Sequence, residues 1–410
     1  MLDLSQFRTI SFKKRNECAV CQRPLDSPTI QLPDFPVSEI YVDRLIDEKI
    51  GFVDQNFHVC IHCGHGQISN IIDPNILYRE SYFFRTSMSK TARRSNDFFL
   101  TFIQDIIKRK KFKKIFEIGC NDLYLLNSLK SRAAHLIGID PVLKSDEMNI
   151  SDKKITVIGD FFENIDLSNF GDYNPSLILS SHTLEHLENP RQFIQLLFEH
   201  FNEKSVFIFQ FPGFETLVDN YRFDQVFHQH LQYFSLKSII FLLNELEGEL
   251  IDFRVNPHHW GSLMVAFKKK SKKQSGNQNE KFLPLCRSFD PEDIRTHYEM
   301  FKCQMNFVSQ HLTSIYGEKI YGYGAALMLP ILAYHLDNDL SCLEGVIDDD
   351  VSKHGMYYIN LPVKICPMPG LEEIQKSVML ITAVDNTSII LPKALSLNPA
   401  KIILPFNSIC

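Results

Sequence analysis

The stretch Lys113-Lys-Ile-Phe-Glu-Ile-Gly119-Cys-Asn-Asp122 decides the fold of the middle of the chain. Its first half is an apolar run typical of a buried strand, and residues 123–131, which follow, have the pattern of a helix. Gly119 allows a ligand to approach the backbone closely, and the free N–H groups at the start of the helix offer hydrogen bonds. The stretch therefore predicts a strand–turn–helix unit with a ligand site at the turn.

The same alternation continues on both sides of this unit. Residues 135–140, 155–160, 176–181 and 205–211 are predicted to be buried strands, and residues 98–109 and 191–201 are predicted to be helices. This order predicts an α/β fold with a parallel sheet covered on both faces. The alternation resumes at residues 319–326, 343–350, 377–384 and 401–406, so we expect a second sheet of the same kind.

Acidic and aromatic side chains stand where these strands end. Asp140 follows the second strand, the position from which a carboxylate reaches both ribose hydroxyls in nucleotide-binding α/β folds. Asp160 and Phe161 follow the third strand and suit the edge and the face of an adenine. The turn lacks the three glycines that accommodate a pyrophosphate, so the pattern favours S-adenosylmethionine, which carries adenosine without phosphate. The alternative is a sheet whose acidic strand ends bind nothing.

The fourth strand leads into His182-Thr-Leu-Glu185-His186. On a helix, this HxxEH string would be the arrangement of inverted zinc peptidases. The string begins at a strand end, however, and no segment for a third ligand is apparent. We therefore disfavour a peptidase and place His182 among the cofactor-binding residues.

A histidine cluster follows the fifth strand, in Phe227-His228-Gln229-His230, with Tyr233 close behind. Imidazole titrates near neutral pH, so a histidine at this place is suited to remove a proton from a carbon or a hydroxyl. The alternative is a structural role. Further on, His259 lies in a His-His-Trp-Gly-Ser string that either lines the same cleft or packs in the core.

Four of the ten cysteines form two pairs with CxxC spacing: Cys18 and Cys21, then Cys60 and Cys63. Two such turns complete a tetrahedron of thiolates, which is the preferred geometry of a structural zinc site. Four free buried cysteines are the alternative.

Length and composition limit the remaining possibilities. The 410 residues are enough for two or three domains. The net charge of −6 gives no overall attraction to nucleic acid, and no apolar run is long enough to cross a bilayer. The first residues lack the apolar core of a signal peptide, so we expect a cytoplasmic protein.

Three domains are predicted: a zinc-binding domain over residues 1–75, a donor-binding domain over 76–268 and a C-terminal Rossmann-like domain over 282–410. The polar, lysine-rich stretch 268–281 predicts an exposed linker. In the last domain, a Tyr-Gly-Tyr-Gly turn at 321–324 and Asp348 resemble a nucleotide-binding turn without its final glycine.

Six strings in order resemble the sugar C-methyltransferases that act on nucleotide-linked 4-keto-deoxysugars. CxxC…CxxCG is similar to the zinc-binding start of that family, and EIGCNDLYLL to its EIxSNDGYLL turn. HTLEHLENP resembles HVLEHxxDP, and QFPGF…FHQHLQYFSL resembles EFPxx…YHEHxxYFSL. HHWGSLMV is similar to the family's HGGSL strand, and YGYGAA with VIDDDVSKHG to its C-terminal domain.

The resemblance implies a class I methyltransferase sheet and a role for each matching residue. His230 would be the base that forms an enolate, with His228 as the second candidate, and Tyr82 would contact the sugar. The implied methyl-donor residues are Glu117, Gly119, Asn121, Asp140, Asp160 and Phe161, to which we add His182. We expect the substrate to contact Phe227, Gln229, Tyr233 and His259. The implied zinc ligands are Cys18, Cys21, Cys60 and Cys63.

The chain departs from the family around the sugar. YHEH is FHQH here, so Phe227 replaces a phenol and Gln229 a carboxylate, and Leu123 stands where the family's cofactor turn has glycine. We expect carbon methylation of a nucleotide-linked ketosugar, with S-adenosylmethionine and a structural zinc ion as cofactors. The alternatives are methylation of a sugar oxygen or nitrogen, or a weakened paralogue that only binds a sugar nucleotide. The expected partner is a small nucleotide-sugar substrate, with no nucleic acid, no membrane and a monomer as the default state.

Overall fold

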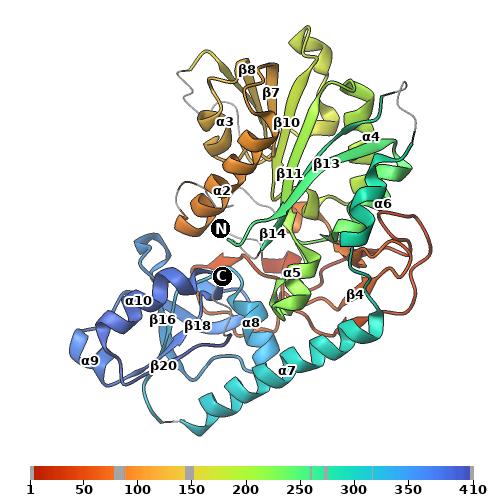
Figure 1. The fold of residues 1–410 in the computed structure, drawn as a ribbon. Helices are drawn as coiled ribbons and strands as arrows, with labels where there is room; N and C mark the ends of the chain where they lie inside the picture. Colours follow the sequence, from red (N-terminus) through yellow and green to blue (C-terminus); the bar gives the residue numbers. More distant parts are fainter. Residues whose placement is uncertain are drawn as a thin grey trace.

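The computed structural model describes residues 4–77, 87, 89–143, 152–258, 261–271, 276–315 and 317–406. Two seven-stranded sheets account for most of the strands (Figure 1). The N-terminal segment of the chain lies between the two sheets (Figure 1). The long helix α7 (Pro291–Ser314) runs along the lower edge of the molecule in this view.

The first sheet contains the strands that the sequence predicts. Its order is β13-β14-β11-β10-β7-β8-β9. Five strands are parallel: β7 (Phe112–Ile118), β8 (Ala133–Ile139), β9 (Ile155–Ile158), β10 (Ser176–Ser181) and β11 (Val206–Pro212). β14 (Ser262–Lys269) is antiparallel to both β11 and β13 (Gly248–Val255). Numbered along this sheet, the order is 3-2-1-4-5-7-6, which confirms the predicted class I methyltransferase sheet.

Helices cover both faces of this sheet, because successive side chains of its strands point to opposite sides. α2 (Lys90–Ile107) and α3 (Tyr124–Ser128) pack on one face. α4 (Pro190–His200) and α6 (Leu236–Glu245) pack on the other face. On β10 the alternation is direct, since Leu177 and Leu179 face the first pair of helices and Ile178 faces the second.

The second sheet has the order β20-β19-β15-β16-β18-β17-β3. Its parallel strands are β15 (Ile320–Tyr323), β16 (Leu343–Ile347), β18 (Leu361–Cys366), β19 (Val378–Ile381) and β20 (Lys401–Ile403). The helices α8 (Leu329–Leu336), α9 (Leu371–Gln375) and α10 (Thr387–Leu397) follow its strands. This is the predicted C-terminal α/β sheet, with its topological switch point between β15 and β19.

The N-terminal segment contributes strands to three sheets. β2 (Ile30–Leu32), β4 (Gln55–Val59) and β5 (Gly66–Ile68) form a small antiparallel sheet that is completed by β12 (Gln232–Tyr233) from the middle of the chain. β1 (Phe12–Lys14) pairs with β6 (Asn70–Ile72), shortly before α1 (Pro74–Leu77). β3 (Tyr41–Val42) pairs with β17 (Tyr357–Tyr358) at the edge of the second sheet.

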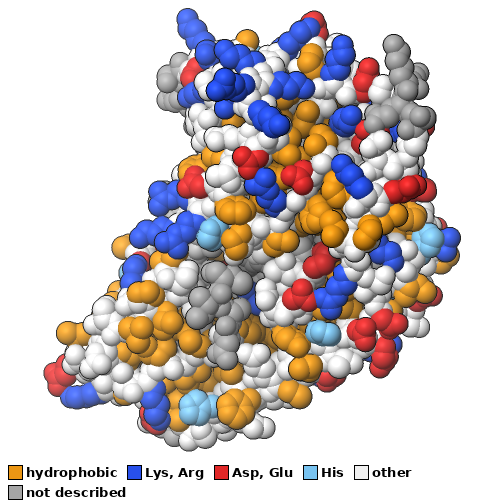
Figure 2. Space-filling view, viewed as in Figure 1, with side chains coloured by type: hydrophobic (Ala, Val, Ile, Leu, Met, Phe, Trp, Pro, Cys, Tyr) orange, Lys and Arg blue, Asp and Glu red, His pale blue; other side chains and the backbone are white. Residues whose placement is uncertain are grey.

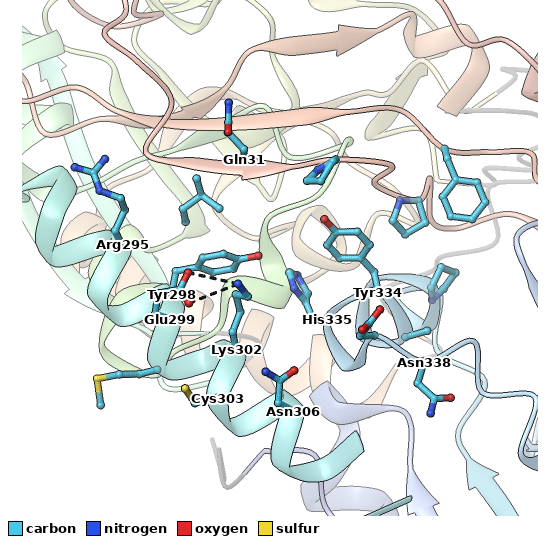
Figure 3. A pocket seen from close by; sticks show the side chains of 18 of the residues that line it. Gln31, Arg295, Tyr298, Glu299, Lys302, Cys303, Asn306, Tyr334, His335 and Asn338 are labelled. Atoms are coloured by element: carbon cyan, nitrogen blue, oxygen red, sulfur yellow. Dashed lines mark hydrogen bonds and ion pairs between the residues drawn. The ribbon is translucent and has the colours of Figure 1, made fainter. Parts of the chain in front are cut away.

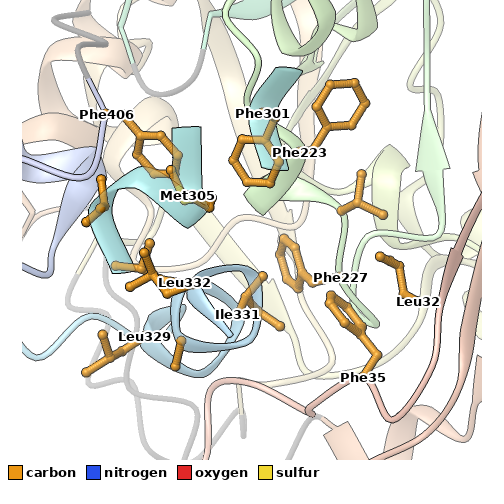
Figure 4. Packing of buried hydrophobic residues seen from close by; sticks show 14 of the residues in the cluster. Leu32, Phe35, Phe223, Phe227, Phe301, Met305, Leu329, Ile331, Leu332 and Phe406 are labelled. Carbon is orange, nitrogen blue, oxygen red and sulfur yellow. The ribbon is translucent and has the colours of Figure 1, made fainter. Parts of the chain in front are cut away.

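One hydrophobic cluster joins all three sequence blocks (Figure 4). Leu32 and Phe35 come from the N-terminal segment, Phe227 from the loop before β12, Phe301 from α7 and Ile331 from α8. α5 (Phe214–Asp219) also packs here through Phe214. The relative positions of the blocks are therefore set by side-chain packing as well as by strand pairing.

The predicted linker is only partly a linker. β14 continues to Lys269, and a 3₁₀ helix begins at Gln278. Asn279 is buried, and its side chain accepts from the N–H of Leu250 and donates to the carbonyl of Gly248, which ties this segment to β13. A polar low-complexity sequence hid this contact, because asparagine serves equally in loops and as a buried hydrogen-bonding group.

Lysine and arginine side chains gather at the upper end of the first sheet in the view of Figure 2. The run 108–114, from the end of α2 into the first residues of β7, contains six of them. This is the amino end of the parallel strands, opposite to the carboxyl end where ligands bind in such sheets. Among the described residues, no helix is long and apolar enough to cross a membrane.

Candidate active site and metal site

The four paired cysteines form one cluster. Their four sulfur atoms lie within 4.8 Å of one another, with Cys18 Sγ 3.6 Å from Cys63 Sγ and Cys21 Sγ 3.5 Å from Cys60 Sγ. In a tetrahedron with metal–sulfur bonds of 2.3 Å, sulfur atoms are about 3.8 Å apart. The cluster therefore fits a tetrahedral metal ion.

The two turns that hold the cysteines have matching geometry. The residue after each pair, Gln22 or Gly64, has positive φ (60° and 72°). Its N–H donates to the carbonyl of the first cysteine of its turn, at 2.9 Å from Gln22 to Cys18 and 2.8 Å from Gly64 to Cys60. Two equivalent turns facing each other explain why the four sulfurs converge, as the spacing predicts.

The turn after β7 is held by the carboxylate at the end of β8. Asp140 accepts hydrogen bonds from the N–H of Asn121 (2.9 Å) and from the N–H of Val142 (3.0 Å). A carboxylate has about four acceptor sites, so these two bonds leave capacity for the hydroxyls of a ribose. The structure thus brings together two of the predicted donor-binding residues.

Glu117 is buried directly beneath this turn. Burial raises its pKa well above the ordinary value, and the nearby carboxylates of Asp140 and Asp122 raise it further. Its Oε2 has no hydrogen-bond partner among the described residues. Glu117 therefore places a carboxyl oxygen without a described partner at the turn, which fits a role in binding a polar ligand group.

The third strand end presents an exposed ring. Phe161 is 56 % exposed. Asp160 accepts from the N–H of Phe161 (2.7 Å) and from the side-chain amide of Asn164 (2.8 Å). An exposed aromatic ring at the carboxyl edge is available to contact a flat ligand, as the sequence predicts.

Leu123, which stands where the family pattern has glycine, does not narrow the turn after β7. Its φ is +65°, but its side chain is buried, and a Cβ added to Gly138 on β8 would lie 3.0 Å from Leu123 Cδ2. Gly119 is required for packing as well, because a Cβ there would lie 2.0 Å from Thr183 Oγ1. The turn keeps its shape around a leucine that points into the core.

Three of the residues predicted to act at the substrate have structural partners. His228 Nδ1 accepts from the side-chain amide of Gln55 (3.0 Å), and its Nε2 faces the carbonyl of Phe35 (3.3 Å). Gln229 forms two hydrogen bonds with Ser38, and the buried Tyr233 hydroxyl donates to the carbonyl of Gln225. This geometry does not support His228 as a base. Gln229 links the loop to the N-terminal segment, and the Tyr233 hydroxyl holds the loop itself through Gln225 and Phe227.

His230 lies instead in a cluster with Glu185 and His186. One ligand atom of each of these residues lies within 4.8 Å of the others, and the rings of His186 and His230 meet edge to face with centroids 5.0 Å apart. Phe227 covers the other side of His230, with ring centroids 4.1 Å apart. The sequence pattern predicts His230 but misses Glu185 and His186 as its neighbours, although the HxxEH string contains both.

His182 contacts this cluster from the end of β10. Its Nδ1 lies 3.1 Å from Glu185 Oε1, and its Nε2 lies 3.2 Å from Ser262 Oγ on β14. Burial lowers its pKa to about 4, so the ring is neutral at pH 7. Residues 184–186 form a single 3₁₀ turn, so the helical arrangement of a zinc peptidase is not formed, as we expected. Tyr82 and His259 lie outside the described residues.

The turn after β15 is closed by neighbouring side chains. Asp348 at the end of β16 accepts from the N–H of Ala325 (2.7 Å), which repeats the pairing of Asp140 with Asn121 in the first sheet. The carbonyl of Ala325 accepts from Tyr41 (2.7 Å) and from Lys353 (3.2 Å). This side of the turn is therefore occupied by protein groups, which argues against a dinucleotide there.

A groove of about 1280 Å³ lies elsewhere, between β2, α7 and α8 (Figure 3). Tyr298, Tyr334 and His335 line it, together with the exposed ion pair of Lys302 and Glu299. None of the predicted site residues that the structure describes lines this groove.

Comparison with known proteins identifies the middle of the chain. Residues 89–249 match a family model described as a methyltransferase domain. This part of the chain is a methyltransferase domain. The matched segment begins at the cap of α2 and ends in β13. It includes the turn after β7, called the donor turn below, and His230. It excludes the cysteine cluster and the second sheet.

No curated protein matches the chain. Among solved structures, the N-methyltransferase NodS from Bradyrhizobium japonicum WM9, in complex with S-adenosyl-L-homocysteine, is 13 % identical with a TM-score of 0.35 and covers 45 % of this chain and 89 % of its own. An S-adenosylmethionine-dependent methyltransferase from Clostridium acetobutylicum ATCC 824 is 10 % identical with a TM-score of 0.33 and covers 44 % of this chain and 92 % of its own. Likenesses this low say nothing about the acceptor of the methyltransferase domain, and the resemblance to sugar C-methyltransferases stays a prediction.

Proposed function

We propose that this methyltransferase transfers a methyl group from S-adenosylmethionine to a carbon atom of a nucleotide-linked ketosugar. The observation that carries the proposal is the position of His230. It lies beside Glu185 and His186 at the carboxyl end of β10, the strand next to the donor turn of β7. Proton removal and methyl transfer would therefore occur at the same edge of the sheet.

The residues at the donor turn have distinct roles in this proposal. Asp140 orients the turn and accepts hydrogen bonds from the ribose, Phe161 contacts the adenine face, and Glu117 binds a polar group of the donor. When bound, S-adenosylmethionine supplies an electrophilic methyl group.

His230 acts on the acceptor. It takes the proton from the carbon next to the sugar's carbonyl group, and the electron pair of that C–H bond becomes the enolate. The enolate carbon bonds to the methyl carbon as the methyl–sulfur bond breaks, which leaves S-adenosylhomocysteine and a protonated His230. Phe227, whose ring lies tilted against that of His230, keeps water away from the base. The sugar resemblance, rather than the geometry, indicates a nucleotide-linked ketosugar as the acceptor.

We also propose that the cysteine cluster holds a structural zinc ion. Four thiolates at tetrahedral spacing leave no position for a catalytic water. The ion would fix the two turns and the strand β5 that follows the second turn.

Two measurements test the proposed activity. Calorimetry of the full chain with S-adenosylmethionine should show binding in the micromolar range, and Asp140→Asn should weaken it at least about tenfold, since an amide replaces a charged acceptor. A methyl-labelled donor should then label nucleotide-linked ketosugars and not the corresponding sugars without a keto group. Absence of donor binding would support the non-catalytic paralogue, and labelling of sugars that lack the keto group would support methylation of oxygen or nitrogen.

A further inference from the structure

Glu185 is a buried carboxylate surrounded by imidazoles. It is 1 % exposed, and no lysine or arginine in the described part of the chain forms an ion pair with it. Its Oε1 faces His182 Nδ1, and its Oε2 has no hydrogen-bond partner among the described residues. Burying a carboxylate in this way costs several kcal/mol unless a positive charge lies beside it.

Within the described part of the chain, the groups that face Glu185 come from four places in the fold. His182 follows β10, His186 lies in the 3₁₀ turn, His230 precedes β12, and Tyr233 lies on β12. The pKa of Tyr233 is raised by burial and, further, by the charge of Glu185, so the phenol stays neutral. Among the residues that the structure describes, the remaining sources of compensating charge are protons on the imidazoles.

Hydrogen bonds assign a different task to each imidazole. The neutral His182 donates from Nδ1 to Glu185 and accepts from Ser262 at Nε2, so it orients the carboxylate. His186 donates from Nδ1 to the carbonyl of Gln229 (2.8 Å), so its proton uptake occurs at Nε2. His186 and His230 are therefore the imidazoles that a negative Glu185 makes more basic.

We infer that Glu185 is a positioning residue that raises the proton affinity of the His186–His230 pair. Glu185 supplies a negative charge beside His230. The neutral Gln229, which directly precedes His230 in the sequence, cannot supply that charge. Burial raises the pKa of Glu185 itself to about 7. The catalytic role of Glu185 rests on the proposed function. Its effect on the proton affinity of His186 and His230 can be measured without substrate.

The first test uses the full chain without ligands. Side-chain-labelled histidines are titrated by NMR in the wild type, in Glu185→Gln and in Glu188→Gln, with His186→Gln and His230→Gln to assign the signals. Glu188 is a matched control because its side chain is 36 % exposed and pairs with Lys13. In Glu185→Gln, the pKa values of His186 and His230 should fall by about one unit, since removing an adjacent negative charge disfavours the imidazolium. In Glu188→Gln they should not move.

The second test is kinetic. In Glu185→Gln, kcat should fall about tenfold or more with KM within about threefold, and the rising limb of the pH–rate profile should move to lower pH. If Glu185→Gln does not fold, Glu185→Asp keeps the charge and should lower the histidine pKa values by less than half a unit.

Three results would overturn the inference. The first is unchanged titration of both histidines in a folded Glu185→Gln. The second is a fall in kcat without a shift of the pH profile. The third is a second metal ion per chain that is lost in Glu185→Gln, because Glu185 would then be a ligand. Wild-type protein that transfers no methyl group would contradict the proposed function alone, since the titration would still report on Glu185.

Discussion

At the scale of single residues, the donor turn shows how a departure from a pattern is accommodated. Leu123 occupies a left-handed conformation that costs a residue with a Cβ about 1–2 kcal/mol. It is tolerated because its side chain is buried in the core of the first sheet, and burial of a leucine contributes more than that cost.

Two substitutions separate these opposing effects. Leu123→Ala should destabilise the protein by about 2–5 kcal/mol through the lost side chain. Leu123→Gly should be more stable than Leu123→Ala by up to about 1 kcal/mol, because relief of the positive φ exceeds the entropy cost of glycine. Urea unfolding measures both.

Leu125 provides the control for this comparison. It is equally buried but lies inside α3, where glycine is about 1 kcal/mol worse than alanine. At position 125 the alanine variant should therefore be more stable than the glycine variant, which is the reverse of the order at position 123. The same order at both positions would contradict the account of Leu123.

At the scale of elements, the second cysteine turn is connected to the loop that carries His230. The turn leads into β5, and β5 pairs with β12 through Gln67 with Gln232 and Gly66 with Tyr233. His65 reinforces the pairing, since its Nε2 lies 2.9 Å from Gln232 Oε1. A metal ion in the cysteine cluster would thus stabilise the loop that carries His230 from a distance.

Cys60→Ser tests this connection. We expect about one zinc ion per wild-type chain by elemental analysis, and loss of the ion in Cys60→Ser. Hydrogen exchange in residues 66–68 and 232–233 should then accelerate at least about tenfold. Cys303→Ser, at an exposed cysteine on α7, should change neither quantity. Zinc-free wild-type protein with slow exchange in β5 and β12 would contradict the role of the ion.

At the scale of the whole molecule, a buried ionic cluster connects the two large sheets. Arg222 pairs with Asp224 through two hydrogen bonds of 2.8 Å and with Asp385, which follows β19, at 2.5 Å. Thr91 at the start of α2 donates to Asn386 (2.7 Å) next to it. The switch point of the second sheet therefore lies against the methyltransferase domain.

Asp385→Asn should lower the free energy of unfolding by about 1–3 kcal/mol, because the buried Arg222 loses one of its two charged partners. Asp349→Asn breaks the exposed pair with Lys393, leaves an acceptor for the long hydrogen bond from Tyr323 (3.4 Å), and should cost less than about 1 kcal/mol. Chemical denaturation of both variants is the measurement. Equal effects would mean that Arg222 and Asp385 do not stabilise this contact.

Much of the architecture was readable from local sequence. Buried parallel strands leave continuous apolar runs, which is why β10 was predicted at its observed bounds, and acidic residues at strand ends marked the ligand edge. α7 also had a readable signal that was not used, since Ile294, Tyr298, Phe301, Met305 and Val308 repeat at helical spacing.

Contacts between distant segments were not readable. β3 and β12 have two residues each, too few to show a pattern, and each is defined only by its partner. His228 and Gln229 carry functional groups that suit catalysis, but their partners Gln55 and Ser38 lie far away in the sequence. A polar side chain that stabilises a fold and one that performs chemistry look the same until its neighbours are known.

Proton exchange at the acceptor tests the central claim most directly. A nucleotide-linked 4-keto-deoxysugar is incubated with the enzyme and S-adenosylhomocysteine in deuterated water. The wild type should introduce deuterium at the carbon next to the carbonyl group, and His230→Ala should do so about 10²–10⁴ times more slowly. Methyl transfer by the wild type without exchange, or full exchange by His230→Ala, would contradict carbon methylation with His230 as the base.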